Sequence, residues 1–345
     1  MSSSPVILEL GSQSLKLHYQ SPRSGVFRKA RFSWDLGHEV YSNGRISQKT
    51  LRTALETIYE LRSRGFHPRN LLAIATGALR DARNRKVFIR QLEDKLGVEV
   101  RVISGQEEAS LLAHGYLRSY KTLPALITDI GGGSLEIVYL GADRTILRDS
   151  LPLGAIRLHY LGLDELEDHD RHSRWNEDLV TGFIRSHLED ASLLTAGEIY
   201  TTGGTGKAVW KVLGKTGFGV EDLEGLVDDM RRNGPPSGIK PDRARVFFPG
   251  VLVLLQLLVH SKARCMTYLK IPAGRIFLQR MVQKTAPGAD ADRKRFMLRN
   301  MRITTIRPTL SSFFPAGRGD AGGKDRPQGQ ETQDRQEEEG QDRQD

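Results

Sequence analysis

The chain has 345 residues, one cysteine and a formal net charge of +9. A single cysteine excludes an internal disulfide framework and is typical of a reducing compartment, so we expect a cytoplasmic protein. The first residues lead straight into an apolar segment, without the basic start and apolar core of a signal peptide. The most apolar stretch, 246–259, is interrupted by Pro249, Gly250 and Gln256 and is too short to cross a bilayer. We therefore expect a buried helix there and no membrane partner.

The charge is unevenly distributed along the chain. The last 30 residues hold nine acidic and five basic side chains, so the first 315 residues carry a net charge of +13. A basic body suits polyanions such as nucleic acid, nucleotides or an inorganic phosphate chain, and it also occurs on ordinary solvated surfaces. We expect no specific nucleic-acid partner. Apolar residues are nearly absent after Arg307, which predicts a disordered tail at 307–345.

The first third of the chain alternates extended and helical patterns. Ser47 is an N-cap candidate, and Gly65 and Gly97 are expected to end two helices. In order, we expect strands at 6–10, 15–20 and about 26–34, a helix from Ser47, a strand at 71–75, a helix that ends at Gly97, a strand at 98–103 and a helix from Ser104 to about Arg118.

The rest of the chain repeats this order. We expect strands at 125–129, 135–140 and 145–152, helical material at 155–187, a strand at 198–201, a glycine turn at 202–206 that leads into a helix, a loop at 214–240 around a weak helix at 221–232, a long helix from Pro241, a strand at 265–269 and a helix at 275–282. Pro241 suits the first turn of a helix. Cys265 lies in an apolar strand context, and we expect it to be buried.

The stretch from Thr128 to Glu136 carries the most informative chemistry. Asp129 closes an apolar run, three glycines and Ser134 follow, and the apolar alternation then resumes. This layout predicts a β-hairpin with a glycine turn, whose amide N–H groups are open to a phosphate because no side chains cover them. Asp129 and Glu136 flank the turn as hard oxygen ligands suited to Mg²⁺. Taken alone, the pattern is more typical of a plain tight turn.

The same layout occurs near the N-terminus. Glu9 aligns with Asp129 and Gly11 with Gly131, at an offset of 120 residues. Because this offset is the size of a small domain, we infer two related halves with one phosphate-gripping hairpin each. Two such hairpins facing one cleft would hold a phosphate chain from both sides.

Six motifs carry a family resemblance, and they are Glu9–Ser14, Ala75–Ala82, Ile103–Ala109, Asp129–Glu136, Leu151–Leu158 and Thr202–Thr205. Together they resemble the exopolyphosphatase and guanosine pentaphosphate phosphohydrolase (Ppx/GppA) family in its short form. The resemblance implies an α/β fold with two duplicated domains of the actin, sugar-kinase and heat-shock-chaperone type, which is ribonuclease H-like. We expect the domains at 1–123 and 124–306, with a last helix at about 275–285 placed to pack back on the first domain. A homodimer fits the family.

The resemblance also assigns roles to single residues. Glu108 matches the catalytic glutamate that activates the attacking water, and Glu9 would assist from the opposite hairpin. A base must be ionised, and the first turn of a helix favours the ionised form. Asp129 and Glu136 match metal-associated carboxylates, which implies Mg²⁺ as the cofactor. The substrate-binding candidates are Gly11, Ser12, Gln13, Ser14, Lys16, Arg80, Gly131, Gly132, Gly133, Ser134, Gly203, Gly204 and Thr205.

Three positions depart from the family pattern. The family has aspartate where Glu9 stands and asparagine where Gln13 stands, so each functional group is displaced by about 1.5 Å. A misplacement of about 1 Å can cost around a hundredfold in rate. Arg245 stands where an acid is expected. These departures predict hydrolysis that is slow, altered in substrate, or lost.

Ordinary structural interpretations also apply to several candidates. Glu108 is equally well placed as an ordinary first-turn acid, and Arg80 and Arg83 as solvated charges. Lys207 lacks a full phosphate-loop pattern and suits a surface lysine. The stretch 168–172, with two aspartates and two histidines, has no further ligand nearby at metal-site spacing and suits an exposed loop.

Three functions follow from this pattern. The first is an Mg²⁺-dependent phosphohydrolase that releases terminal phosphate from inorganic polyphosphate or guanosine pentaphosphate. The second is a binding protein of the same fold, which keeps its affinity for polyphosphate or an alarmone without turnover. The third is a kinase or ATPase of the same superfamily, which needs an adenosine pocket in the second domain.

Overall fold

The computed structural model describes residues 6–20, 26–63, 71–120, 122–143, 146–163, 175–189, 199–271 and 303–305. They all belong to one compact unit, Met1–Ile306. The expected tail at 307–345, the expected helix at 275–285 and the charged stretch 168–172 lie outside the described residues.

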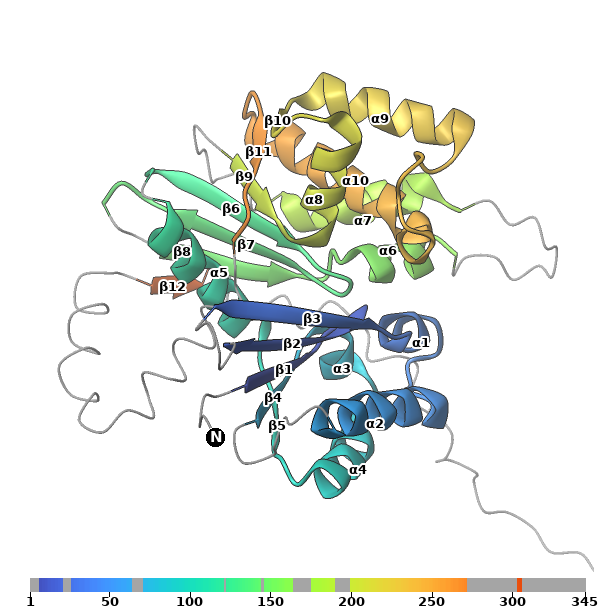
Figure 1. Ribbon diagram of the computed structural model, residues 1–345. Helices are drawn as coiled ribbons and strands as arrows, with labels where there is room; N and C mark the ends of the chain where they lie inside the picture. Colours follow the sequence, from blue (N-terminus) through green and yellow to red (C-terminus); the bar gives the residue numbers. More distant parts are fainter. Residues whose placement is uncertain are drawn as a thin grey trace, which may run out of the picture. The chain divides into compact units, whose positions relative to one another are not determined.

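The N-terminal half builds a mixed sheet with the strand order β3-β2-β1-β4-β5 (Figure 1). Its strands are β1 (Val6–Leu10), β2 (Ser14–Gln20), β3 (Phe27–Ser33), β4 (Leu71–Ala75) and β5 (Val100–Val102). β1 pairs antiparallel with β2 and parallel with β4. The short apolar runs of β1 and β4 are buried on both faces, as central strands require.

The second sheet repeats this arrangement. Its strands are β6 (Ala125–Ile130), β7 (Leu135–Leu140), β8 (Ile146–Leu151), β9 (Ile199–Thr202), β10 (Gly217–Phe218), β11 (Met266–Tyr268) and β12 (Ile303–Thr305), in the order β10-β11-β9-β6-β7-β8-β12. Five neighbouring strands of this sheet, β8-β7-β6-β9-β11, correspond one by one to β3-β2-β1-β4-β5 of the first sheet. The pairings are also the same: the first three strands in each series are antiparallel, and the last two pairings are parallel. The predicted duplication and the actin-like α/β fold are thereby confirmed.

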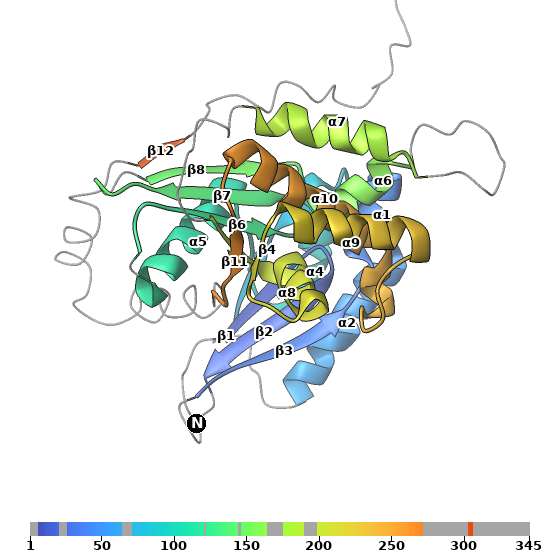
Figure 2. The ribbon, with the colours of Figure 1, turned by 90° about the horizontal axis from the view of Figure 1, so that it is seen from above.

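Helices cover the outer faces of both sheets, and one helix, α5, lies between the two sheets (Figures 1 and 2). They are α1 (Leu36–Asn43), α2 (Gln48–Ser63), α3 (Gly77–Asp81), α4 (Arg85–Leu96), α5 (Gly105–Ser119), α6 (Ala155–Leu161), α7 (Glu177–Leu188), α8 (Gly203–Leu213), α9 (Val220–Asn233) and α10 (Pro241–Ser261).

Helix α5 contacts both sheets. Ala113 and Tyr116 are fully buried against Ile127 and Val138 of the second sheet. Leu111, on the same helix, packs with a cluster of isoleucines on the N-terminal sheet. The start of α5, which carries Glu108, is therefore fixed between the two sheets.

Some local predictions were wrong. The short helix α1 was not predicted, since it contains Gly37 and ends at Gly44 in the left-handed conformation, with φ of 69°. The expected weak helix near 221–232 is a full amphipathic helix, α9. Cys265 is exposed because it precedes β11 rather than lying within it.

Helix α10 is the apolar helix predicted from the sequence, with Pro241 in its first turn. Among the described residues it is the one helix long and apolar enough to cross a membrane, and 72% of its most apolar window is buried inside the fold. Its burial is that of a core helix, on which α6, α7, α8 and α9 pack.

Candidate active site

The two predicted hairpins face each other at their turns. In each hairpin the glycine amide donates to a serine carbonyl, Gly11 to Ser14 at 3.1 Å and Gly131 to Ser134 at 2.9 Å. A Cβ at Gly132 would lie 2.8 Å from the Cβ of Ser12, so the two turns are in direct contact. The paired arrangement predicted from the repeat is therefore present, and the strand ends of both hairpins border one space.

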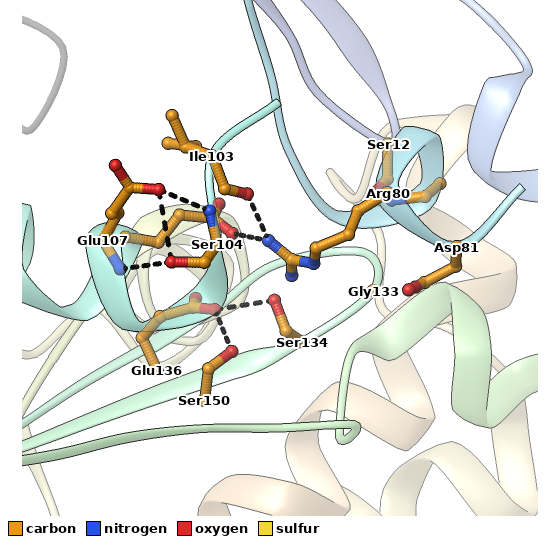
Figure 3. A network of polar contacts seen from close by, with 12 residues as sticks. Ser12, Arg80, Asp81, Ile103, Ser104, Glu107, Gly133, Ser134, Glu136 and Ser150 are labelled. Atoms are coloured by element: carbon orange, nitrogen blue, oxygen red, sulfur yellow. Dashed lines mark hydrogen bonds and ion pairs between the residues drawn. The ribbon is translucent and has the colours of Figure 1, made fainter. Parts of the chain in front are cut away.

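Glu108 lies in the first turn of α5, held by Arg80. Arg80 Nη1 donates to Glu108 Oε2 at 2.7 Å and to the carbonyl of Ile103 at 2.9 Å. Ser104 caps the helix in a capping box with Glu107, whose side chain turns back to the cap and away from Arg80 (Figure 3). The two adjacent acids thus have different roles: Glu107 stabilises the start of the helix, and Glu108 lies in the candidate site.

The Glu108 carboxyl has an unusual acidity. Burial raises its pKa to about 7, Arg80 acts in the opposite direction, and the carboxylates of Glu9 and Asp129 add to the increase. The desolvation outweighs the ion pair because the side chain is enclosed and other acids share the space. A carboxyl with this pKa accepts a proton near neutral pH more readily than an ordinary glutamate.

Asp129 is the last residue but one of strand β6 and lies against the second glycine turn. It pairs in register with Thr202 of β9, and a Cβ at Gly203 would overlap its Oδ1 atom. Burial raises the pKa of Asp129, while Lys16 lowers it. In the described part of the chain, the Asp129 carboxylate has no hydrogen-bond or ion-pair partner, so its oxygens remain free for a ligand.

Glu136 stands directly opposite Asp129 in the hairpin and is buried. Its Oε1 atom accepts hydrogen bonds from Ser134 Oγ at 2.6 Å and Ser150 Oγ at 2.9 Å (Figure 3). Burial raises the pKa of Glu136 well above its ordinary value, and the carboxylates of Glu108 and Asp129 add to this. The three acids therefore form one electrostatic cluster.

Glu9 differs from these three. Its carboxylate forms an ion pair with Lys16 and a 3.0 Å contact with His18 Nε2. Burial raises the pKa of Glu9, but Lys16 and His18 more than offset this and leave it well below the ordinary value. Glu9 is thus ionised, and its charge is balanced by Lys16 and His18 of the same hairpin. The same ion pair fixes the position of Lys16.

The turns offer backbone donors to an anion. The amides of Gly132 and Gly133 donate to no partner among the described residues. Helix α8 begins at Gly203 with no side-chain cap, so the amides of its first turn, including those of Gly204 and Thr205, are open. Uncapped helix starts and glycine turns are favourable positions for phosphate.

Two predicted substrate-binding side chains point elsewhere. Ser12 Oγ accepts a hydrogen bond from the Ala78 amide at 3.0 Å. Gln13 Nε2 donates to the Asp242 carbonyl at 3.1 Å, which directs the side chain to the start of α10. Ser12 and Gln13 thus hold the turn in place through these hydrogen bonds to Ala78 and Asp242.

Comparison with known proteins identifies the family. A model of the Ppx/GppA phosphatase family matches residues 24–271. The chain belongs to this family.

Relatives within the family are similar over part of their length. Exopolyphosphatase 2 of Mycobacterium tuberculosis is 35% identical over 133 residues, which cover 36% of this chain and 41% of that protein. Exopolyphosphatase 1 of Mycobacterium bovis is 29% identical over 160 residues, which cover 44% of this chain and 46% of that protein. These matches thus span less than half of each relative.

Solved structures of the family share the fold. The exopolyphosphatase of Cytophaga hutchinsonii superposes with a TM-score of 0.65 and 18% identity over 81% of this chain and 98% of that chain. The Ppx/GppA family member of Aquifex aeolicus gives a TM-score of 0.58 and 18% identity, again over 81% and 98%. At these identities the similarity concerns the fold.

A clasp joins the two halves of this family member beside the turns. Arg157 of α6 pairs with Asp81 at 2.5 Å, donates to the Gly133 carbonyl at 2.9 Å and lies over the Tyr41 ring, 4.6 Å from its centre. Tyr41 in turn donates to Asp81 at 2.9 Å. Gly133 has no room for a side chain here, since Tyr41 Oη occupies the position of its Cβ.

Sequence reasoning missed several cations around the site. Lys29 and Arg31 lie on β3, next to Lys16 on β2. Arg243 of α10 lies over the start of α8, where a Cβ at Gly204 would lie 2.6 Å from its Nη1 atom. The alternation of basic and apolar residues in Phe27–Ser33 carried the signal for the first two. No local signal points to Arg243, because its position depends on how α10 packs.

Arg245 does not lie with the acid cluster. It lines a separate hollow of about 520 Å³, together with Gln13, Trp34, His38 and Tyr160. Burial lowers the pKa of His38 in this hollow, and Arg245 acts in the same direction. The arginine at position 245, where the family pattern has an acid, therefore changes the charge of this hollow and not that of the acid cluster.

Proposed function

We propose that the protein is a phosphohydrolase that releases terminal phosphate from a phosphoanhydride, inorganic polyphosphate or guanosine pentaphosphate. The observation that carries this proposal is the position of Glu108. It has a pKa of about 7 and shares one space with the Asp129 and Glu136 carboxylates. Phosphoryl transfer needs an in-line nucleophile and neutralisation of the phosphate charge, and this site contains groups suited to both.

In the proposed reaction, Glu108 accepts the proton of the attacking water. Arg80 holds Glu108 before substrate binds, and its guanidinium is also a natural partner for a phosphate oxygen. A phosphate that draws Arg80 away frees Oε2 of Glu108 for the water. Glu9 takes part by holding Lys16, and the open amides of the Gly131–Ser134 turn and of α8 bind the non-reacting phosphates.

The residues fit a magnesium ion as cofactor. Asp129 and Glu136 face each other across one hairpin, and the Asp129 oxygens have no partner among the described residues. Two carboxylates are the usual protein share of an Mg²⁺ site, which phosphate oxygens and water complete. In this proposal Asp129 and Glu136 hold the ion, and the ion supplies charge neutralisation at the phosphate.

Phosphate release with Mg²⁺ tests the proposal. Inorganic polyphosphate and guanosine pentaphosphate are compared for the unmodified protein, Glu108→Gln and Glu107→Gln. Glutamine at 107 keeps the capping box, so this variant is a matched control for the loss of one carboxylate. We expect kcat to fall by about 10²- to 10⁴-fold in Glu108→Gln only. Equal rates in the two variants would remove Glu108 from the chemistry.

The ion pair at Glu9 favours a second candidate, a binding protein without turnover. Lys16 and His18 already neutralise the Glu9 carboxylate. Glu9 would then not repel a bound anion, and it would take no part in the attack on phosphate. Tight, salt-sensitive binding of polyphosphate without release of phosphate would support this candidate. ATP-dependent phosphorylation of an acceptor would instead indicate a kinase. Homodimer formation and a cytoplasmic location remain predictions.

A further inference from the structure

The start of α6 holds the backbone of the Gly131–Ser134 turn. Amides of α6 donate to the carbonyls of Gly131 and Gly132 at 2.9–3.1 Å, and Arg157 Nε donates to the Gly133 carbonyl at 2.9 Å. The C=O and N–H groups of a trans peptide point in opposite directions. The open amides of Gly132 and Gly133 share their peptide groups with the two carbonyls that the α6 amides hold, so both point away from α6.

The Arg157 side chain continues from this turn into the N-terminal half. Its Nη2 atom donates to Asp81 Oδ2 at 2.5 Å, and Tyr41 Oη donates to the same Asp81 oxygen at 2.9 Å. Burial raises the pKa of Tyr41, so the phenol remains a neutral donor. Arg157 and Asp81 are both partly buried, so salt screens their attraction less than that of a surface pair. One guanidinium thus connects the glycine turn to Asp81.

Asp81 is the last residue of the short helix α3 and directly follows Arg80. Arg80 Nη1 donates to Glu108 Oε2 at 2.7 Å, and the Ala78 amide near the start of α3 donates to Ser12 Oγ at 3.0 Å. Helix α3 therefore contacts three parts of the site: the first hairpin, α5 and, through Asp81, α6. Because Arg80 and Asp81 are adjacent in one helix, a displacement of Asp81 also moves the backbone of Arg80.

The two halves also pack against each other beside the clasp. A Cβ at Gly37 of α1 would lie 2.8 Å from Ile156 Cδ1 of α6, and His38 Nδ1 lies 3.3 Å from Tyr160 Oη. These contacts involve neither partner of the Arg157–Asp81 ion pair, so we expect the chain to stay folded without that pair. What the pair adds is a fixed position of α3 relative to the glycine turn.

We propose that Arg157 is a positioning residue, which together with Asp81 fixes the glycine turn relative to α3, so that the open amides of the turn and the Arg80 guanidinium meet one phosphate chain. The inference rests on the proposed function, which assigns these amides and Arg80 to the phosphates. Without the pair, α3 and the turn move independently. A shift of about 1 Å takes a donor out of hydrogen-bond distance of a phosphate oxygen.

Two conservative variants separate geometry from charge. Asp81→Asn removes a negative charge near the anion site, which by charge alone would strengthen anion binding, and its amide oxygen still accepts from Tyr41. Arg157→Lys keeps the positive charge but lacks the planar fork that reaches the Gly133 carbonyl and Asp81 together. The control is Glu107→Gln, which also removes an acid near the site and keeps the capping box of α5.

Equilibrium binding of tripolyphosphate in EDTA is measured for the unmodified full chain, the two variants, their double variant and the control. Urea unfolding first shows which variants are folded, and one folded clasp variant suffices because the two change the pair from opposite sides. We expect tripolyphosphate to bind about tenfold more weakly to each clasp variant, as for one lost hydrogen bond to a charged group. The double variant should lose at most about twofold more, because both changes act on one pair. The control should change by about twofold or less.

Unchanged or tighter binding by Asp81→Asn, full binding by Arg157→Lys, or losses that multiply in the double variant would overturn the inference. Failure of the unmodified protein to bind tripolyphosphate in EDTA would also overturn it, whereas phosphate release with Mg²⁺ would still support the proposed function. Conversely, weaker binding by the clasp variants supports the inference even if no phosphate is released, because the measurement needs no hydrolysis.

Discussion

Replacing Gly203 with alanine tests how the site holds Asp129. Gly203 begins α8 with φ of 78°, in the left-handed region that L side chains rarely adopt. A Cβ at this position would overlap Asp129 Oδ1 and lie 3.0 Å from Asp129 Cγ. The substitution therefore adds backbone strain and pushes the carboxylate away from its present position.

The size of the effect follows from these contacts. Carbon atoms pack best at about 3.5–4.0 Å, so Asp129 has to move by about 1 Å. A shift of that size at a reacting centre costs around a hundredfold in rate. The left-handed conformation adds about 1–2 kcal/mol of destabilisation. We expect kcat for phosphate release to fall about a hundredfold and the free energy of unfolding to fall by at least the strain.

Gly214→Ala is the matched control, since it lies at the other end of α8 with φ of 69° and open space around its Cβ position. It carries the same kind of backbone strain without a clash. Phosphate release at saturating substrate and urea unfolding are measured for both variants. If Gly203→Ala keeps the kcat of Gly214→Ala, the position of Asp129 does not limit the reaction and the reasoning is wrong.

Three further predictions concern the residues around the site. The base Glu108 acts only when ionised, so kcat/KM should rise with pH up to about 7 and level off above it; a flat profile from about pH 5 to 8 would contradict this. Arg157→Met should lower the free energy of unfolding by about 2 kcal/mol, because it removes the pair with Asp81. The control Arg231→Met removes an exposed pair and should cost under about 1 kcal/mol, so similar costs in urea unfolding would argue against the clasp. Ser104→Ala should cost about 1 kcal/mol in the same assay by removing the cap of α5, and an unchanged midpoint would show the cap to be dispensable.

Features encoded locally were predicted well. The hairpin of Asp129 and Glu136 and its counterpart at Glu9 follow from acid, glycine and alternation within about ten residues, and both hairpins are present as expected. The helix expected from Ser104 begins at Gly105, with Ser104 as its N-cap, and this start is also encoded within a few residues.

Features that depend on packing between distant segments were not predicted. The clasp joins Arg157 to Asp81 across 76 positions, and Arg243 reaches the start of α8 only because α10 packs beside it. The neutralisation of Glu9 by His18 required the register of β1 and β2 in addition to the motif. Tertiary packing decides such contacts, and no single segment of sequence contains them.

Phosphate release in water enriched in oxygen-18 tests the central claim most directly, because hydrolysis transfers one solvent oxygen to each phosphate. We predict that inorganic phosphate released from polyphosphate carries one oxygen-18 atom and that Glu108→Gln reduces the rate of this labelled release while Glu107→Gln does not. Release of phosphate without solvent oxygen, or labelled release that is independent of Glu108, would contradict the account.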